Sequence, residues 1–315
     1  MVNGSKRTDE IIAFYNVENL FPPDPPVMHY LDPTPSGLKN WDERKYQVKL
    51  RKIAEVFHLI SLHKGQSPLF IGLSEIQGEQ PLQDLLAKDV FKEYAFVRNG
   101  NLDRRGMGVY LLYQKKRIQL ISSETLDLAV GFEVDTSEEI SARSILKCKF
   151  LLDSAVFNVL LLHLPSQRDN NVKIKLRTHI LKALKEEITK IDKEEAVIMM
   201  GDFNVNPDDE DIAALFYQNQ NRRCFNNPFL PLYTARQFSA YHQRGGLLFD
   251  QIMFSEEFYD NRFPMQFSGG EVFSHPRLRA AGRKFAARPA RTYAGTRYIG
   301  GYSDHFPVLA SFIRN

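Results

Sequence analysis

Cysteine is scarce in this chain. Its 315 residues include only Cys148 and Cys224. Neither has Cys-x-x-Cys spacing or a nearby histidine in the sequence, which disfavours both a zinc site and a disulfide framework. Because Cys148 lies in the apolar run 145–152, we expect it to be a small buried hydrophobic side chain.

Long hydrophobic runs are also missing. No segment approaches the ~20 apolar residues that a helix needs to cross a bilayer, so we expect no membrane insertion. Residues 1–10 are polar and contain no signal-peptide core. A cytoplasmic location is therefore the default expectation, with a removed signal as the alternative.

The chain has no large excess of charge of one sign. Its formal net charge is +3, and 25% of its residues are charged, close to the average of soluble proteins. The total charge therefore identifies no partner, and only local clusters of charge can do so. With 43% hydrophobic residues, the chain can bury a core in one large domain or two ordinary ones.

Short strand-like segments alternate with two long amphipathic segments. Apolar residues recur at helical spacing in 46–62 and 172–191, which predicts two long helices. The expected strands are 11–17, 69–74, 107–113, 118–128, 144–151, 156–162, 196–200, 247–254 and 307–313. Many strands with few helices predict an α/β fold of mixed sheets packed together, with the helices outside.

Two pairs of these strands are expected to be neighbours. A tight turn at Asp153-Ser154 would join 144–151 to 156–162. Lys115-Lys116-Arg117 would form a similar hairpin turn between 107–113 and 118–128.

Polar side chains stand at the ends of the expected strands. They are Asn16, Glu18, Glu75, His163, Asp202, Asn204, Asp304 and His305, and Asp250 lies inside the expected strand 247–254. Taken singly, each is most simply a solvated strand end or a helix cap. If the strand ends meet, however, their carboxylates would repel one another and be costly to desolvate. A bound divalent cation removes that cost, and oxygen donors without cysteine favour Mg²⁺ or Mn²⁺ over zinc.

Asp250 is unusual because it lies inside the apolar run 247–252. A buried aspartate needs a partner. His305 is the natural candidate, since an Asp–His pair fixes the imidazole tautomer and raises its pKa. The alternative is an aspartate that accepts hydrogen bonds from backbone amides in a turn.

Two motifs, Gly201-Asp202-Phe203-Asn204 and Ser303-Asp304-His305, carry a family resemblance. Together with Asn16, Glu75 and His163, in this order, the chain resembles the endonuclease/exonuclease/phosphatase superfamily. That superfamily includes DNase I, abasic-site endonucleases of the exonuclease III type, neutral sphingomyelinases and inositol polyphosphate 5-phosphatases. Segments 14–21, 34–41 and 292–304 are similar to a bacterial branch. The resemblance implies a DNase I-like four-layer α/β sandwich, one domain over 1–315, and a metal-dependent phosphoesterase.

The resemblance also implies roles for the residues that bind metal and water. Glu75 would be the principal metal ligand, and Asn16 and Asp304 would complete the metal's inner or outer shell. Asp202 would orient or deprotonate the attacking water. Glu18 stands where several members have aspartate, and it would either bind metal or support Asn16.

Further roles concern the phosphate ester itself. Asn204 would hold a non-bridging oxygen, and His305, paired with Asp250, would stabilise charge on the scissile phosphate. His163 would protonate or hydrogen-bond the leaving oxygen. The implied mechanism is in-line attack of water on phosphorus. One ion at Glu75 is the simplest count, and a second near Asp202 and Asn204 is the alternative.

A basic segment precedes the last motif. Its members are Arg277, Arg279, Arg283, Lys284, Arg288, Arg291 and Arg297, and no acid occurs between Glu271 and Asp304. The ordinary interpretation is a solvated loop. The functional one is a positive rim that binds a polyanion. Tyr293 and Tyr298 interleave with the arginines, a combination that suits nucleic acid. We expect Arg291, Arg297 and Tyr298 to contact substrate, with Arg104 and Arg105 extending this surface.

Three functions follow. The first is a nuclease or other phosphodiesterase acting on nucleic acid, with binding that falls steeply with salt. The second is a phosphomonoesterase or phosphodiesterase of small phosphorylated metabolites or lipid headgroups. The third is a non-catalytic scaffold, which the intact set of polar residues argues against. The sequence leaves endo or exo action and the oligomeric state open.

Overall fold

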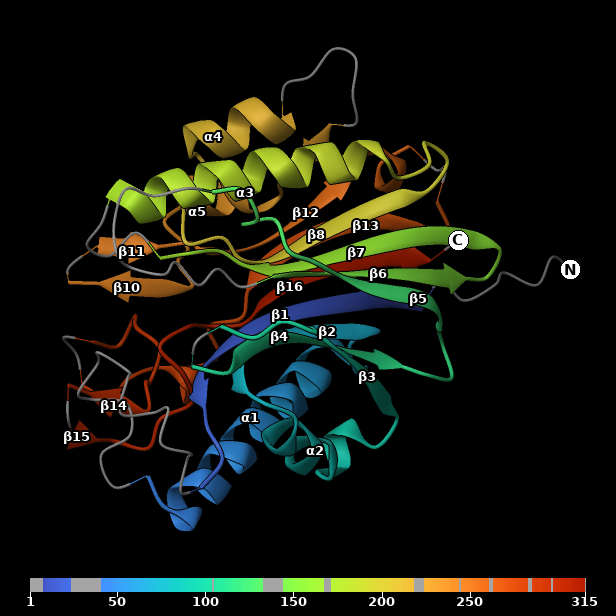
Figure 1. The fold of residues 1–315 in the computed structure, drawn as a ribbon. Coiled ribbons are helices and arrows are strands. Elements are labelled where there is room, and N and C mark those ends of the chain that lie inside the picture. The colour runs from blue at the N-terminus through green and yellow to red at the C-terminus, as the bar shows by residue number, and fades with distance from the viewer. Residues whose placement is uncertain are drawn as a thin grey trace, which may run out of the picture.

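Two six-stranded sheets form the centre of the molecule (Figure 1). The structure is a computed structural model that describes residues 8–23, 41–103, 105–132, 144–166, 171–217, 224–243, 245–260, 263–282, 285–295 and 297–314. The first sheet has the order β13-β16-β1-β2-β4-β3, and the second has the order β5-β6-β7-β8-β12-β9. Two short hairpins, β10-β11 and β14-β15, stand apart from them.

The strands of the first sheet are β1 (Thr8–Leu20), β2 (Phe70–Gln77), β3 (Tyr94–Arg98), β4 (Met107–Gln114), β13 (Met265–Val272) and β16 (Val308–Arg314). Those of the second are β5 (Gln119–Leu126), β6 (Ile145–Leu152), β7 (Ala155–His163), β8 (Ala196–Asp202), β9 (Phe225–Asn226) and β12 (Asp250–Ser255). The hairpins are β10 (Ala240–His242) with β11 (Gly245–Leu247), and β14 (Tyr293–Ala294) with β15 (Arg297–Tyr298).

The helices are α1 (Glu43–Lys64), α2 (Gln80–Leu86), α3 (Asn171–Thr189), α4 (Glu210–Ile212) and α5 (Phe229–Thr234). Single turns at Asp89–Phe91, Glu256–Phe258 and Pro276–Leu278 are 3₁₀, and Ala213–Tyr217 is a π-helical turn. None of the helices in the described ranges is long and apolar enough to cross a membrane.

The elements stack in four layers (Figure 1). Helices α1 and α2 cover the outer face of the first sheet, and α3 and α4 cover that of the second. Both sheets are mixed, because β1 and β2 run parallel, as do β7 and β8, whereas the other pairs are antiparallel. The predicted four-layer α/β sandwich is confirmed.

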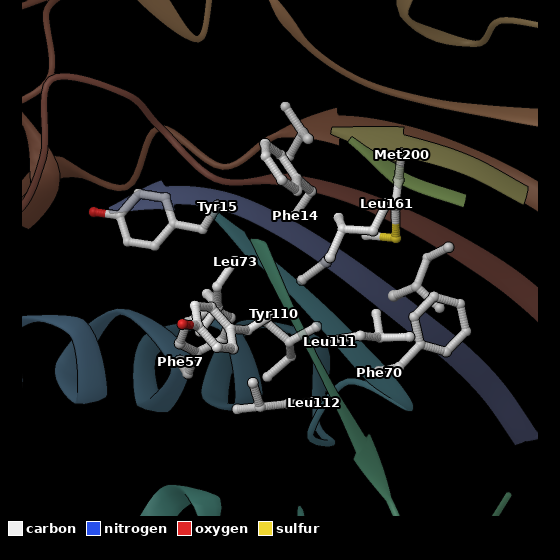
Figure 2. Close-up of a cluster of buried hydrophobic side chains, with 14 of the residues drawn as sticks. Phe14, Tyr15, Phe57, Phe70, Leu73, Tyr110, Leu111, Leu112, Leu161 and Met200 are labelled. Atoms are coloured by element: carbon white, nitrogen blue, oxygen red, sulfur yellow. The ribbon is translucent and has the colours of Figure 1, made fainter. Parts of the chain in front are cut away.

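The two sheets meet across a tightly packed apolar layer (Figure 2). Phe14 on β1 lies near Leu161 on β7 and Met200 on β8. Gly72 on β2 faces all three, and a Cβ added there would lie only 2.6 Å from Cδ1 of Leu161. The two sheets therefore approach each other closely at Gly72.

The two long helices begin and end close to their predicted limits. The α1 helix begins after Asp42, whose side chain accepts a hydrogen bond from the Lys45 amide, as N-caps do. It ends at Gly65, whose φ of 74° suits a left-handed C-cap. The expected helix 172–191 corresponds to α3. The predicted hairpin of β6 and β7 is also confirmed, with Asp153 at a φ of 54° in its turn.

Two expectations about strands are wrong. Strands β4 and β5 are not neighbours, because β4 pairs with β2 and β3 whereas β5 pairs with β6 in the other sheet. Residues 115–117 therefore cross between sheets, and their local turn looks like a hairpin in the sequence. The single strand expected over 247–254 is two strands, β11 and β12, and Asp250 begins the second.

Some expected features lie outside the described residues. These are most of the loop 22–35, which is rich in proline, most of segment 34–41, and the basic residues Arg104, Arg283 and Lys284.

Gly201, on β8, lies against the backbone of β7. Its φ is 156°, and a Cβ there would lie 2.0 Å from the carbonyl oxygen of Leu162. Because a backbone oxygen can move little, we expect Gly201→Ala to lower the free energy of unfolding by about 3 kcal/mol. Urea unfolding measures this, with Gly269→Ala as the control, since no atom lies within 4 Å of that added Cβ. Equal stability of the two variants would contradict the prediction.

Candidate active site

Three site residues lie in one row across the second sheet. His163 is the last residue of β7 and pairs in register with Asp202, the last residue of β8. Asp202 in turn pairs in register with Asp250, the first residue of β12. All three side chains are buried. The sheet itself therefore fixes the order His163, Asp202, Asp250.

The first sheet contributes Asn16 and Glu75 from two parallel strands. Asn16 pairs in register with Ser74, and the pairing of β1 with β2 is irregular from there to Leu20. Glu75 is the extra residue of a β-bulge between Ser74 and Ile76, where the pairing of β2 with β4 shifts. A bulge redirects the side chain of its extra residue.

Hydrogen bonds join the two sheets at this point. The Asn16 side-chain amide donates to Glu75 Oε1 at 3.2 Å and to Asp202 Oδ2 at 3.0 Å. Nε2 of His163 lies 3.5 Å from Asp202 Oδ2 and 3.9 Å from Glu75 Oε1. The backbone amide of Asn19 donates to Glu75 Oε2 at 3.0 Å. Four of the predicted site residues thus form one contact network.

Asp202 and Asn204 are linked through the turn after β8. The Asn204 backbone amide donates to Asp202 Oδ1 at 2.9 Å, and its side-chain amide donates to the Leu164 carbonyl at 2.8 Å. Burial and the negative charge of Asp250 raise the pKa of Asp202 to about 7. His305 and the hydrogen bonds from Asn204 and Asn16 act in the opposite direction. Asp202 can therefore accept or release a proton near neutral pH.

His305 and Asp250 form the pair that the sequence predicts. Nδ1 of His305 lies 2.6 Å from Asp250 Oδ2, and the Ser239 hydroxyl donates to the same oxygen at 2.5 Å. Burial alone would lower the pKa of His305, but the carboxylate of Asp250 outweighs it and holds that pKa well above its usual value. The imidazole is therefore a cation over a wide pH range, and Asp250 orients it.

Ser303 fixes the motif that carries Asp304. Its hydroxyl donates to the Asn16 carbonyl at 2.7 Å and accepts from the His305 amide at 3.1 Å. Asp304 lies between them in the chain, with Oδ1 at 3.9 Å from His305 Nε2. Its other oxygen lies 3.5 Å from Nη2 of Arg291. Asp304 thus faces the same site as Asn16.

Two sets of side chains offer donors to a cation. Glu75, Asn16 and Asp304 supply carboxylate and amide oxygens, which suit Mg²⁺ or Mn²⁺. Asp202, Asp250 and His305 form the other set, with one ligand atom of each within 4.8 Å of the others. Because Oδ2 of Asp250 already accepts from the Ser239 hydroxyl and lies 2.6 Å from Nδ1 of His305, we assign Asp250 to orienting the imidazole. In the first set, Nδ2 of Asn16 faces Glu75, and Oδ1 of Asn16 accepts from the Glu18 amide.

Glu18 contacts both Thr292 and Asn16. Its carboxylate accepts from the Thr292 amide at 2.6 Å, and its own backbone amide donates to Asn16 Oδ1 at 3.0 Å. Burial and the negative charge of Asp304 raise the pKa of Glu18 to about 7, while Lys49 opposes them. Of the two roles expected for Glu18, these contacts favour support of Asn16.

Several site residues adopt a left-handed backbone. Glu18, Asn19, Glu75 and Asn204 have φ values of 54°, 51°, 66° and 53°. Non-glycine residues are uncommon in this region. Such strain persists only where surrounding contacts hold it, and it concentrates at functional sites.

The predicted basic rim is only partly free for a substrate. Arg277 pairs with Glu55 at 3.3 Å, and Arg279 donates to the Ser274 carbonyl at 2.8 Å. Arg288 donates to the Gln243 carbonyl and lies over the rings of Tyr241 and Phe285. These contacts tie the basic segment to neighbouring elements.

Of the three expected substrate residues, Arg291 alone has a described contact with another site residue, Asp304. Arg297 is exposed on the β14-β15 hairpin. The ring of Tyr298 packs against Tyr293, with centroids 5.4 Å apart. In Figure 1 this hairpin and β10-β11 lie at the same end of the sandwich, on the left. Arg297 and Tyr298 thus lie on a hairpin at this end of the sandwich.

Comparisons with known proteins agree with this geometry. A model of the endonuclease/exonuclease/phosphatase family matches residues 11–314. No curated protein sequence matches the chain significantly.

Several solved structures match along nearly their whole length. D. rerio TDP2 complexed with single strand DNA product is 15% identical, with a TM-score of 0.61 and coverage of 97% of this chain and 99% of that one. The Bacteroides thetaiotaomicron mannosyl-6-phosphatase is 14% identical, with a TM-score of 0.60 and coverage of 96% and 99%. A Bacteroides vulgatus endonuclease/exonuclease/phosphatase is 18% identical, with a TM-score of 0.60 and coverage of 98% and 100%.

At these identities the similarity establishes the fold, and the family follows from the model that covers residues 11–314. This chain belongs to the endonuclease/exonuclease/phosphatase family and has the phosphoesterase fold of that family.

Proposed function

We propose that the protein is a hydrolase of phosphate esters that depends on Mg²⁺ or Mn²⁺, and that residues 1–315 form its single catalytic domain. The observation that carries the proposal is the network in which Asn16 joins Glu75 to Asp202 across the two sheets. It gathers acids, amides and imidazoles at one point, where phosphoryl transfer needs charge stabilisation and a positioned water.

Glu75, Asn16 and Asp304 would hold the cation. The Asn19 amide fixes one oxygen of Glu75, so that carboxylate is oriented in advance. Crowded carboxylates at the same place support this assignment, since a cation offsets their repulsion. A divalent cation there supplies positive charge to the phosphoryl oxygens. One such ion is the proposed count.

Asp202 would orient the attacking water and accept its proton. Its pKa of about 7 suits a general base near neutral pH. Asn204, fixed by its hydrogen bond to Leu164, would present its side-chain amide to a non-bridging oxygen.

His305 would stabilise negative charge on the phosphoryl group as it develops. The Asp250 carboxylate keeps it cationic and leaves its Nε2 as the donor that can point away from Asp250. His163, whose Nε2 lies between Glu75 and Asp202, would donate to the leaving oxygen. No serine or cysteine nucleophile is required.

Nucleic acid is the first candidate substrate. Arg291 beside Asp304 offers a cation to a phosphate, and Arg297 and Tyr298 extend the surface outward. The alternative is a small phosphorylated metabolite or lipid headgroup. A structural neighbour that is named a mannosyl-6-phosphatase supports this alternative.

Hydrolysis of plasmid DNA and single-stranded oligonucleotides, beside a panel of phosphomonoesters and phosphodiesters, tests the proposal. Each assay is run without a divalent cation, with Mg²⁺ and with Mn²⁺. We expect magnesium-dependent cleavage of nucleic acid, and KM for DNA should rise steeply with salt, because several phosphates are bound at once. Phosphate release with DNA left intact, and little salt dependence, would favour the small-molecule alternative. If no ester were cleaved with either cation, the proposed function would be wrong.

A further inference from the structure

One face of α1 carries three lysines. Lys45, Lys49 and Lys52 are spaced four and three residues apart, so they lie along the same side of the helix. Nζ of Lys45 lies 5.4 Å from the centroid of the Tyr298 ring, and Nζ of Lys52 lies 4.1 Å from that of Tyr302. Cations at these distances are attracted to the ring faces. The lysine face therefore supports the segment that contains β14 and β15.

Lys49 is the buried member of this face, with only 1% of its surface exposed. Its ammonium donates to Thr292 Oγ1 at 2.6 Å and to the Tyr302 carbonyl at 2.7 Å. Thr292 and Tyr302 are the two ends of residues 292–302, which we call the β14-β15 loop. One side chain therefore holds both ends of this loop.

The backbone is closely packed at the same point. The Gly301 amide donates to the Arg291 carbonyl at 3.1 Å. A Cβ added at Gly301 would lie 2.0 Å from the Ala290 oxygen and 2.3 Å from the Arg291 oxygen. The chain entering the loop and the chain leaving it are thus in direct contact, with glycine required between them.

The contact between residues 290–292 and 301–302, which we call the neck of the loop, is connected by Glu18 to Asn16, an expected metal ligand. Its carboxylate accepts from the Thr292 amide and lies 3.9 Å from Nζ of Lys49. Its backbone amide donates to Asn16 Oδ1. The buried side chains of Lys49 and Thr292 and the partly buried carboxylate of Glu18 thus form one set of contacts that reaches Asn16.

The two residues that flank this set of contacts face each other in the site. Arg291 precedes Thr292 by one residue, and Asp304 follows Tyr302 by two. Arg291 Nη2 and Asp304 Oδ2 are 3.5 Å apart. Because both residues adjoin the neck, keeping the neck closed fixes the distance between the Arg291 guanidinium and the Asp304 carboxylate.

We propose that Lys49 is a positioning residue for substrate binding, which acts by closing the neck of the β14-β15 loop and thereby holding Arg291 beside Asp304. The inference rests on the proposed function, because it takes Arg291 as a contact of the substrate phosphate. Lys49 itself is buried beneath the loop and touches no substrate.

The test is a mutant cycle on the substrate that the wild type hydrolyses best. Lys49→Met removes the ammonium, and Thr292→Val removes only the hydroxyl that accepts from it. We expect both to raise KM, by about tenfold for Thr292→Val, with a smaller change in kcat. Thr292→Ser keeps the hydroxyl and should restore a KM close to that of the wild type.

The decisive comparison uses Arg291→Gln. If Lys49 and Thr292 act through Arg291, adding Thr292→Val to Arg291→Gln should change KM by no more than about twofold. The proposal is overturned if the effects of Thr292→Val and Arg291→Gln on KM multiply in the double variant. It is also overturned if Thr292→Ser is as impaired as Thr292→Val, or if the variants lose kcat with KM unchanged. The threonine series decides the matter even where Lys49→Met does not fold, since it leaves the ammonium paired with Glu18.

Calorimetric binding of inorganic phosphate to the magnesium-loaded proteins repeats the cycle without turnover. If the wild type hydrolyses no ester but the variants lose phosphate affinity in a coupled way, the proposed hydrolysis is wrong and the role of Lys49 is supported. If the wild type is active and the two substitutions lower phosphate affinity independently, only the role of Lys49 is contradicted. A wild type that neither binds phosphate nor cleaves an ester would overturn both.

Discussion

Glu75→Gln is expected to lower magnesium-dependent hydrolysis by at least about 100-fold, because it removes the charge of the principal predicted metal ligand. The amide has the same shape, so it can still occupy the bulge and accept from the Asn19 backbone through its carbonyl oxygen. The fold should therefore be kept. Initial rates over a range of Mg²⁺ concentrations measure the loss, and Mn²⁺ binding followed by electron paramagnetic resonance reports the site without turnover.

Glu79→Gln is the matched control. Glu79 lies four residues further along the chain, pairs with Arg98 at 2.7 Å and has a partly exposed side chain. It should bind metal and hydrolyse substrate like the wild type. Retained activity and Mn²⁺ affinity in Glu75→Gln would remove Glu75 from the ligand set.

Asp250→Asn should slow hydrolysis by about 100-fold or more, because an uncharged partner no longer keeps His305 cationic. Two opposing effects set the pKa of His305 and hence the pH dependence of the variant. Burial lowers the pKa of His305 and the Asp250 carboxylate raises it. Without that carboxylate, the imidazole loses its proton at a lower pH than in the wild type. Activity remaining in the variant should therefore decline as pH rises, over a range where the wild type keeps its cationic imidazole.

His305→Ala and Ser239→Ala complete this experiment. His305→Ala should lower kcat to a similar extent while leaving Mn²⁺ affinity nearly unchanged. Ser239→Ala removes one hydrogen bond to Asp250 without changing its charge, so its effect should be much smaller. A His305→Ala variant that mainly lost metal affinity would show that the imidazole is a ligand instead.

The elements of the fold were more predictable than their connections. Helices α1 and α3 and most central strands have clear periodicity, so their existence and approximate bounds follow from the sequence. The crossing from β4 to β5 does not, because a turn of Lys115-Lys116-Arg117 is locally the same whether it closes a hairpin or changes sheets. Strand β13 was missed since its sequence, MQFSGGEV, contains two glycines.

The site could be predicted where chemistry coincides with strand ends. His163 and Asp202 follow from that rule, whereas Asp250 was found as an acid inside an apolar run, and the structure places all three side by side in register. Ser239 and Lys49 could not be found in this way. Ser239 is a common residue in a loop, and Lys49 lies within a helix, where a lysine is ordinarily solvated. The spacing of Lys45, Lys49 and Lys52 places them on one helix face in the sequence. Only the structure shows that this face contacts the β14-β15 loop.

The basic segment shows why charge in a sequence overstates a binding surface. No acid occurs between Glu271 and Asp304, yet Glu55 on α1 and Asp304 pair with arginines of this segment. Glu55 comes from a distant part of the chain and Asp304 lies just beyond the segment, so the composition of the segment itself reveals neither pair. The salt dependence of KM measures the charge that remains available.

The left-handed backbone at Glu18, Asn19, Glu75 and Asn204 has a consequence for how this protein can evolve. Each non-glycine residue in that conformation costs on the order of 1 kcal/mol relative to glycine. A laboratory selection for heat resistance alone would therefore tend to accept glycine at these positions, and at Glu75 and Asn204 it would discard the proposed chemistry. Selection for both traits should instead place its stabilising substitutions away from this end of the sandwich. The distribution of accepted mutations would thus map the site without any knowledge of its substrate.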